Sequence, residues 1–200
     1  MVDVPAVLLS MVERLRKDEP LPDTRPLPLL EAFEAVREAL KEQELYNDDT
    51  LVLLADGESR IILDAQGKLV TSPLFKSVTT PFAVLSSGAS SLECARRGTP
   101  LKASCDDMAQ LFGPRVPCVK VPRGQASAYL IKDQGFLVTG RFPAEVVVAA
   151  ILVEKACRAE LLAPKIGQLH YLNPALCAAE HAVYLASYSK HEKEANDGLR

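Results

Sequence analysis

The stretch that most constrains the fold is Ala128–Gly140, in which two short apolar runs flank Asp133-Gln134-Gly135 and lead directly into a long apolar segment. Glycine adopts the positive φ that a tight hairpin turn needs, so the two runs are predicted to pair as a β-hairpin. Pro143 suits the first turn of a helix, where its missing N–H costs nothing. The stretch therefore predicts a hairpin whose second strand feeds a buried helix ending near Ala163.

The N-terminal part of the chain differs from the rest in composition. Apolar residues at helical spacing predict an amphipathic helix over Pro5–Lys17, and four prolines between Asp18 and Pro28 predict a stiff, extended linker. Residues 1–28 are thus expected to be an appendage, and residues 29–200 to form one domain. Within this domain the periodicity predicts helices at 28–44, 90–97, 106–112 and 174–190, strands at 50–54, 59–63, 68–70, 81–85 and 116–121, and a frayed tail at 192–200.

Composition limits the classes of function. The 200 residues are 48% hydrophobic, which suffices for one core, and the formal net charge of -3 leaves no basic surplus for nucleic acid. The sequence contains no uninterrupted run of eighteen apolar residues, so it does not predict a membrane-spanning helix. The five cysteines are an odd number without a C-x-x-C pair, and the early charge at Asp3 leads us to expect no signal peptide. Reduced thiols in a cytoplasmic protein are therefore expected, with neither nucleic acid nor a membrane as partner.

The sequence contains four blocks whose order and spacing match those of a known family: Ala83–Gly98, Asp106–Gly113, Leu130–Gly140 and Val153–Ala163. These blocks resemble the class II aldolase/adducin family, which includes the fuculose-phosphate aldolases. The hairpin matches the family's strand-turn-strand, whose turn usually reads Asn-His-Gly, and the resemblance spans roughly Leu51–Ala163. It implies an α/β fold with three layers, α/β/α, around a central, mainly antiparallel sheet.

The family's metal site does not carry over. The family binds a divalent metal, usually zinc, through a His-x-His pair, the turn histidine and often a glutamate. Here the His-x-His position falls within Leu85–Gly88, Gln134 replaces the turn histidine, and Thr71–Thr80 holds no acidic residue where the glutamate is expected. Neutral amide and hydroxyl oxygens are poor zinc ligands. We therefore expect no metal and no other cofactor, although the family implies zinc.

The remaining histidines and cysteines do not replace that site. His181 and His191 lie ten residues apart on one predicted helix, about 15 Å along its axis, which is too far to share an ion. They and His170 are expected to be surface or capping residues, with the polar centre of a dimer interface as the alternative. Cys157 and Cys177 fall on apolar helix stripes and should pack as small hydrophobes.

Two functional hypotheses follow, and catalytic activity stays open between them. The first is a non-catalytic, metal-free pseudoenzyme, resembling the adducin head, that binds a small phosphorylated or carboxylated ligand or has an assembly or regulatory role. The second is a divergent aldolase, lyase or epimerase that acts on a sugar phosphate through a site rebuilt from Ser86, Ser87, Asp133, Gln134 and Tyr129. The ligand-binding positions that the resemblance implies are Thr71, Ser72, Ser86, Ser87, Gly88, Asp133, Gln134 and Gly135.

The resemblance also implies a homo-oligomer, a tetramer or a dimer. Two apolar surfaces need a partner: the first predicted helix, and a stripe on the last one formed by Leu176, Val183 and Leu185.

Overall fold

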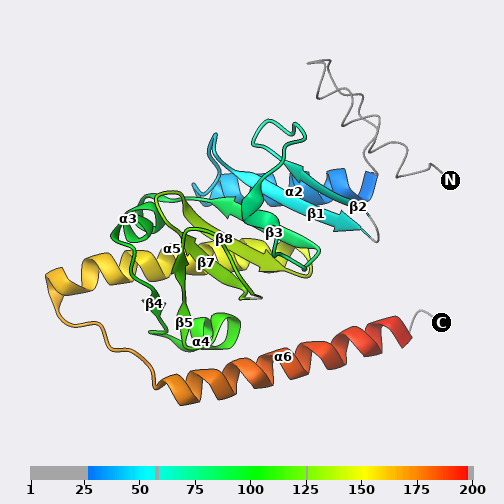
Figure 1. Ribbon diagram of the computed structural model, residues 1–200. Helices are drawn as coiled ribbons and strands as arrows, with labels where there is room; N and C mark the ends of the chain where they lie inside the picture. The colour runs from blue at the N-terminus through cyan, green and yellow to red at the C-terminus, as the bar shows by residue number, and fades with distance from the viewer. Residues whose placement is uncertain (1–26, 57–58, 125, 198–200) are drawn as a thin grey trace.

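The computed structural model describes residues 27–56, 59–124 and 126–197 (Figure 1). A six-stranded sheet lies at the centre of this part of the chain, with the spatial order β2-β1-β3-β8-β7-β6, and β4 and β5 form a separate pair. The strands are β1 (Leu51–Asp56), β2 (Ser59–Leu63), β3 (Phe82–Ser86), β4 (Leu101–Lys102), β5 (Arg115–Val116), β6 (Cys118–Val119), β7 (Ala128–Ile131) and β8 (Gly135–Gly140). The helices are α2 (Leu27–Glu42), the 3-10 helix η1 (Pro73–Phe75), α3 (Ala89–Arg97), α4 (Asp106–Phe112), α5 (Pro143–Ile166) and α6 (Pro174–Asp197).

The predicted hairpin is confirmed as β7 and β8. Asp133 and Gly135 both have positive φ, 64° and 115°, and the N–H of Gln134 donates to the carbonyl of Ile131 at 2.9 Å. β8 also pairs with β3, and β3 pairs with β1, all antiparallel. Only the short β6 runs parallel to its neighbour, β7, in the described sheet. The mainly antiparallel mixed α/β class is therefore confirmed.

Helices cover one face of the sheet. Successive strand residues point to opposite faces, and one set, which includes Val84, Leu130 and Val138, packs in a single core with the helices. α5 contributes Val146 and Val153 to this core, both fully buried. The long apolar segment after the hairpin is thus the central helix of the core, and it extends three residues beyond the expected end at Ala163.

The opposite face carries a smaller core. Leu53, Leu85 and Leu137 point to this side and pack against Leu74 and Phe75 of η1. Among the described residues no longer helix lies there, so the second helical layer of the expected α/β/α arrangement is replaced by a single 3-10 turn and loops. The physical reason lies in Thr71–Thr80, which is short, is interrupted by Pro73 and has four β-branched residues among its ten, so it does not form a helical layer.

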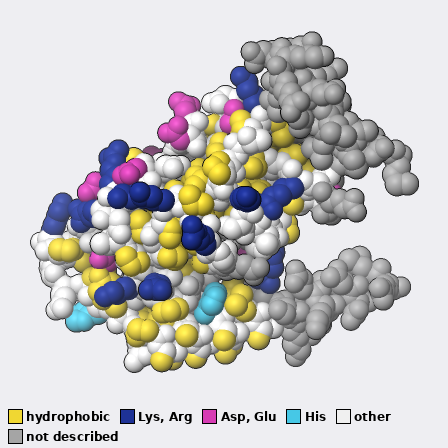
Figure 2. All heavy atoms as spheres, viewed as in Figure 1, with side chains coloured by type: hydrophobic (Ala, Val, Ile, Leu, Met, Phe, Trp, Pro, Cys, Tyr) yellow, Lys and Arg dark blue, Asp and Glu magenta, His cyan; other side chains and the backbone are white. Residues whose placement is uncertain are grey.

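α6 packs against α4 and runs along the lower edge of the molecule (Figure 1). The helix continues to Asp197, so the expected frayed tail is helical over most of its length. Hydrophobic side chains gather along this edge, over α6 (Figure 2), where Leu176 is 53% and Val183 is 69% exposed. No helix in the described part of the chain is long and apolar enough to cross a membrane.

Three other expectations need comment. The strand expected at 116–121 is split, because Arg115–Val116 pairs with β4 whereas Cys118–Val119 joins the main sheet. The run expected as a strand at 68–70 makes only an isolated bridge between Leu63 and Leu69. The predicted helix at Pro5–Lys17 and most of its linker lie outside the described residues.

Candidate functional site

The end of β3 and the turn between β7 and β8 meet at one end of the sheet. The register pairs Ser86 with Phe136, which places Gly135 directly beside the chain at Ser86 and Ser87. A Cβ on Gly135 would lie 2.5 Å from the Cβ of Ser87, and it would also collide with the carbonyl oxygen of Ser86. Six of the eight predicted ligand-binding residues, 86–88 and 133–135, are thus brought together, and the contact is tight.

The Ser86 hydroxyl is fully used inside the protein. It donates to the carbonyl of Leu45 at 2.5 Å and lies 2.9 Å from the hydroxyl of Thr50. Ser86 and Thr50 are both buried, with exposed fractions of 2% and 0%. Since the Ser86 proton is directed to Leu45, Thr50 must donate to Ser86. This hydroxyl therefore joins the start of β1 to the end of β3.

Ser87 is held by Asn47, which follows α2. The side-chain amide of Asn47 donates to the carbonyl of Ser87 at 2.9 Å and to its hydroxyl at 3.1 Å. Asn47 also accepts the N–H of Asp49 through its side-chain oxygen, at 3.0 Å. Its amide thus links the α2–β1 connection to the β3–α3 connection.

A carboxylate from α5 occupies the N-terminus of α3. The two oxygens of Glu154 accept the backbone N–H groups of Ser90 and Ser91, at 2.8 and 2.9 Å. The same carboxylate lies against Gly88, where an added Cβ would be 2.5 and 2.7 Å from its two oxygens. Gly88 is the N-cap of α3, and Glu154 supplies the acceptor for its first N–H groups. The Ser91 hydroxyl accepts the N–H of Gly88 at 2.9 Å.

The turn itself is exposed. The side chains of Asp133 and Gln134 face solvent, beside the buried Gly135. Tyr129, the fifth residue of the rebuilt site, belongs to the other face of the sheet. Its hydroxyl accepts the N–H of Ala126 at 3.0 Å and donates to the carbonyl of Arg123 at 3.2 Å. The structure therefore does not bring Tyr129 to the turn.

Thr71 and Ser72 lie apart from the other six residues. They come directly after the chain segment at Leu69, which forms a bridge with Leu63 on the outer edge of β2. In the sheet, β2 and β1 lie between this edge and β3. Ser72 caps η1, accepting the N–H of Leu74 at 3.3 Å. Both residues line an open pocket of about 470 Å³ together with the cations of Arg60 and Lys76. Arg60 is held in place by donating to the carbonyl of Phe75 at 2.6 Å.

The residues present do not fit the zinc ion that the resemblance implies. Each Glu154 oxygen already accepts a backbone N–H, and the Ser86 hydroxyl donates to a carbonyl. On the turn, Gln134 offers a neutral amide, and Asp133 is a single exposed carboxylate. Zinc in proteins is held by imidazole, thiolate and carboxylate ligands. Within the described residues, no three or more side chains of His, Cys, Asp and Glu are grouped so that they could hold a metal ion.

One histidine and two cysteines have structural contacts inside the protein. His181 donates from Nδ1 to the carbonyl of Gln110 at 2.6 Å, which joins α6 to the last turn of α4, and His170 is exposed. The side chain of His191 lies outside the described residues. Cys157 and Cys177 are buried, as expected from their apolar stripes. A hydrogen bond with the Cys94 thiol, together with burial, raises the pKa of Cys157, so this thiol stays protonated.

Sequence reasoning did not assign a role to Asn47 and Glu154. Glu154 had a detectable signal, since it is a single carboxylate directly after the apolar run Val146–Val153 on a helix predicted to be buried. Asn47 had none, because an asparagine between a helix and a strand is a common turn residue. Each forms its hydrogen bonds with a residue distant in sequence: Asn47 with Ser87, and Glu154 with Ser91.

Comparison with known proteins gives matches at the level of structure. No family model matches the sequence, and no curated protein matches it. An L-fuculose 1-phosphate aldolase matches with a TM-score of 0.62 at 13% identity, over 80% of this chain and 97% of that one. An L-fuculose 1-phosphate aldolase from Glaciozyma antarctica PI12 matches with a TM-score of 0.60 at 15% identity, over 88% of both chains. An aldolase II superfamily protein from Pseudomonas syringae matches with a TM-score of 0.55 at 9% identity, over 86% of this chain and 94% of that one.

At sequence identities of 9–15%, these matches support a shared fold but not a shared activity. The chain has a class II aldolase-like fold, as the hairpin and its following helix indicate from the sequence. The shared fold does not determine the chemistry, because function depends on the residues at the site.

Proposed function

We propose that this chain is a non-catalytic protein on a class II aldolase-like fold, with an assembly or regulatory role. The observation that carries the proposal is the position of Glu154, whose carboxylate binds the N-terminus of α3 beside Gly88. A helix N-terminus is where backbone N–H groups and the helix dipole favour an anion. Here the protein's own side chain fills that position.

The surrounding residues support the same proposal. Catalysis of C–C cleavage needs either a Lewis acid or a matched acid and base. The Ser86 hydroxyl is buried and hydrogen-bonded to both Thr50 and Leu45, so it is not available to a substrate. The one carboxylate of the predicted set, which could act as an acid or a base, is Asp133. Asp133 is exposed and lies on a turn, and no second titratable group of that set lies beside it to form a pair.

Metal analysis and an activity panel test this proposal. The purified chain should contain no stoichiometric zinc, manganese or iron, and it should not cleave or epimerise sugar phosphates when these metals are added. An active class II aldolase assayed in parallel provides the positive control. Cleavage of any sugar phosphate by this chain, lost in Gln134→Ala, would instead support the divergent aldolase or epimerase.

A second candidate function, binding of a small phosphorylated or carboxylated ligand, is favoured by the pocket at Thr71 and Ser72. Two cations, Arg60 and Lys76, line this pocket beside the Thr71 hydroxyl. Arginine and lysine with neighbouring hydroxyl donors are suited to phosphate oxygens. Binding there requires no catalytic group.

Isothermal titration with inorganic phosphate and with a sugar phosphate tests the second candidate. Lys76→Ala should weaken binding, whereas Lys120→Ala, another exposed lysine outside the pocket, should not. No heat of binding at millimolar ligand, or equal loss in both variants, would contradict a site at this pocket.

We further propose a homo-oligomer, a dimer or tetramer, because apolar residues such as Val183 and Leu176 are exposed on α6. Light scattering that shows a clean monomer would contradict it. A cytoplasmic location remains a proposal, supported by five cysteines that are all free thiols.

A further inference from the structure

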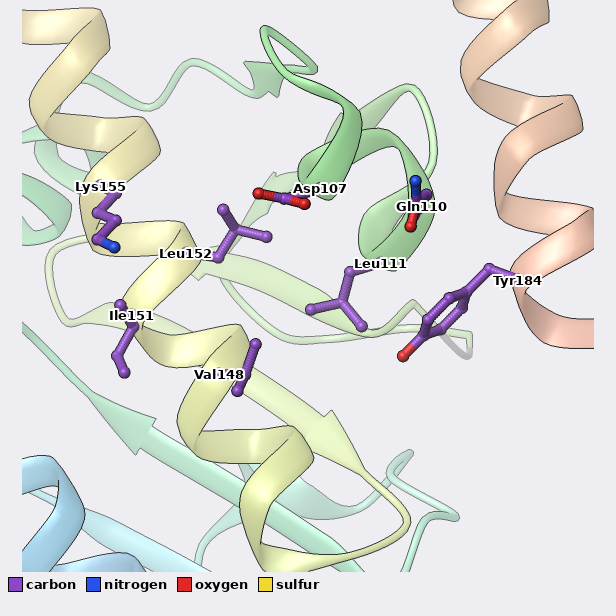
Figure 3. A pocket seen from close by; sticks show the side chains of 8 residues that line it. All are labelled: Asp107, Gln110, Leu111, Val148, Ile151, Leu152, Lys155 and Tyr184. Atoms are coloured by element: carbon purple, nitrogen blue, oxygen red, sulfur yellow. The ribbon is translucent and has the colours of Figure 1, made fainter. Parts of the chain in front are cut away.

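An apolar groove of about 480 Å³ lies between α4, α5 and α6 (Figure 3). Its lining is mainly hydrophobic, and three polar side chains join it: Asp107 and Gln110 from α4 and Lys155 from α5. The apolar lining residues are Leu111 from α4, Val148, Ile151 and Leu152 from α5, and Tyr184 from α6.

The groove faces away from the core of the protein. Val148 is 56% exposed, whereas Val146 and Val153 on the other side of α5 are fully buried. Ile151 and Leu152 are half-buried. An amphipathic helix that lies in a hydrophobic groove is a common way to cover such a surface.

The chain itself contains a segment of matching character. Residues 5–17 carry an apolar stripe at helical spacing, formed by Val7, Leu8, Met11, Val12 and Leu15. A helix of this length spans about 20 Å, and the α5 wall from Val148 to Lys155 rises about 10 Å. The stripe is therefore long enough to cover the whole wall.

α2 and α5 begin at the same end of the sheet. The residues that follow α2 reach the Ser86 end of β3, since the carbonyl of Leu45 accepts the Ser86 hydroxyl. α5 starts after Gly140, which pairs with Phe82 at the opposite end of β3, and its Glu154 reaches the Ser86 end. Both helices thus run in the same direction, and the chain enters α2 near the start of α5.

The linker is long enough for docking within one chain. α2 lies on one flank of α5, and the groove lies on the other (Figure 3). Two helix spacings are about 16–20 Å. The nine residues 18–26, which contain three prolines, would span about 28 Å in an extended polyproline conformation. The connection can therefore pass around the start of α5 to the groove.

We propose that residues 5–17 dock as an amphipathic helix in the groove of their own chain, with the apolar stripe against Val148, Ile151 and Leu152. This docking surface is distinct from the residues around Glu154 and does not depend on the absence of catalysis. The segment would run antiparallel to α5, because Lys17 must lie nearest to the start of α2.

A tryptophan reporter tests this proposal, because the natural sequence has no tryptophan. Met11→Trp in the full chain places a single indole at the centre of the stripe. Its emission should be shifted to shorter wavelength and protected from acrylamide. Adding Val148→Asp should move the emission to that of an exposed indole, because a charge would lie in the apolar contact. The matched control Val183→Asp, on α6 outside the groove lining, should leave the emission unchanged.

A second variant guards against general destabilisation. Leu8→Asp changes only the docking segment, and it should expose the same reporter while leaving the melting temperature of the domain nearly constant. An exposed indole in Met11→Trp alone, or an equal response to Val148→Asp and Val183→Asp, would overturn the proposal. Protection that disappears on dilution together with a dimer mass in light scattering would also overturn it, in favour of docking onto a second copy.

Discussion

The carboxylate of Glu154 accepts the backbone N–H of Ser91 at 2.9 Å, which ties α5 to the start of α3 across 63 positions of sequence. Its other oxygen accepts the N–H of Ser90. Uncapped N–H groups and the helix dipole make a helix N-terminus favourable for negative charge. One side chain therefore both caps α3 and fixes its position on the central helix.

Removing this carboxylate should destabilise the protein. Glu154→Ala should lower the free energy of unfolding by about 1–3 kcal/mol, because two N–H groups lose their acceptor. Glu154→Gln keeps one acceptor and should cost less. Urea denaturation measures both, and Arg158→Gln, on an exposed position of the same helix, is the control.

Gly88→Ala should lower the free energy of unfolding strongly in the natural chain and much less in the Glu154→Ala background, because the added Cβ collides with this carboxylate. Additive costs in the double variant would contradict the contact.

Gly135 should tolerate no side chain. Its φ of 115° disfavours any L-residue, and an added Cβ would collide with the chain at Ser86 and Ser87. Gly135→Ala should therefore cost about 3 kcal/mol or more in unfolding free energy. Gly98→Ala is the matched control, because Gly98 has a φ of 72° with open space around it, and should cost about 1 kcal/mol. Equal costs for the two variants would show that backbone conformation, and not the contact with β3, determines the effect.

The sequence predicts most strands and the helices on one face of the sheet well. Apolar periodicity and turn residues place β2 and α4 to the residue, and they predict the hairpin with its following helix, because these signals are local. The opposite face of the sheet was not predictable in the same way. Its cover at Leu74 and Phe75 is one turn of 3-10 helix, which has no periodicity to detect, and the family resemblance suggested a helical layer in its place.

The candidate site was half predictable. The family resemblance brings Ser86 and Gln134 to the same place, and the register of β3 against β8 accounts for it. It does not predict that Asn47 and Glu154 would occupy the hydrogen-bonding groups there. Those contacts join residues 40 or more positions apart, so even the local signal of Glu154, a carboxylate after a buried apolar run, does not indicate its partner, and Asn47 has no such signal.

Two leucines that look alike in sequence should differ in their contribution to stability. Leu137 on β8 is fully buried, so Leu137→Ala should cost about 2–5 kcal/mol. Leu152 is half-buried at the groove on α5, and its contacts with the described residues alone predict a cost of about 1–2 kcal/mol for Leu152→Ala, to which the proposed docking of residues 5–17 would add. Chemical denaturation of the two variants gives the comparison. A loss at Leu152 as large as that at Leu137 would indicate that the groove is covered in solution.

The five thiols should react with a thiol reagent in an order that follows their exposure. Cys105 is exposed and should react first, and Cys118 should follow slowly because it is half-buried and burial raises the pKa of its thiol. The buried thiols of Cys94, Cys157 and Cys177 should react only in denaturant. Counting released chromophore with time measures this order, and Cys105→Ser should remove the fast phase alone. Fast reaction of more than one thiol in the folded protein would contradict the full or partial burial of the other four.

Tyr46 should make stability fall at high pH. Its hydroxyl donates to the carbonyl of Ala65 at 2.9 Å, and burial raises the pKa of Tyr46 from 10.0 to about 12. The unfolded chain therefore loses this proton first, so the stabilisation is complete below pH 10 and is lost progressively between about pH 10 and 12. Tyr46→Phe should cost about 1 kcal/mol at neutral pH through the lost hydrogen bond. Since other groups also titrate in this range, the quantity to measure is the difference in unfolding free energy between the natural chain and Tyr46→Phe. That difference should shrink as the pH rises from 10 to 12, and a difference that grows or stays constant would show that the hydroxyl is ionised or solvated in the folded protein.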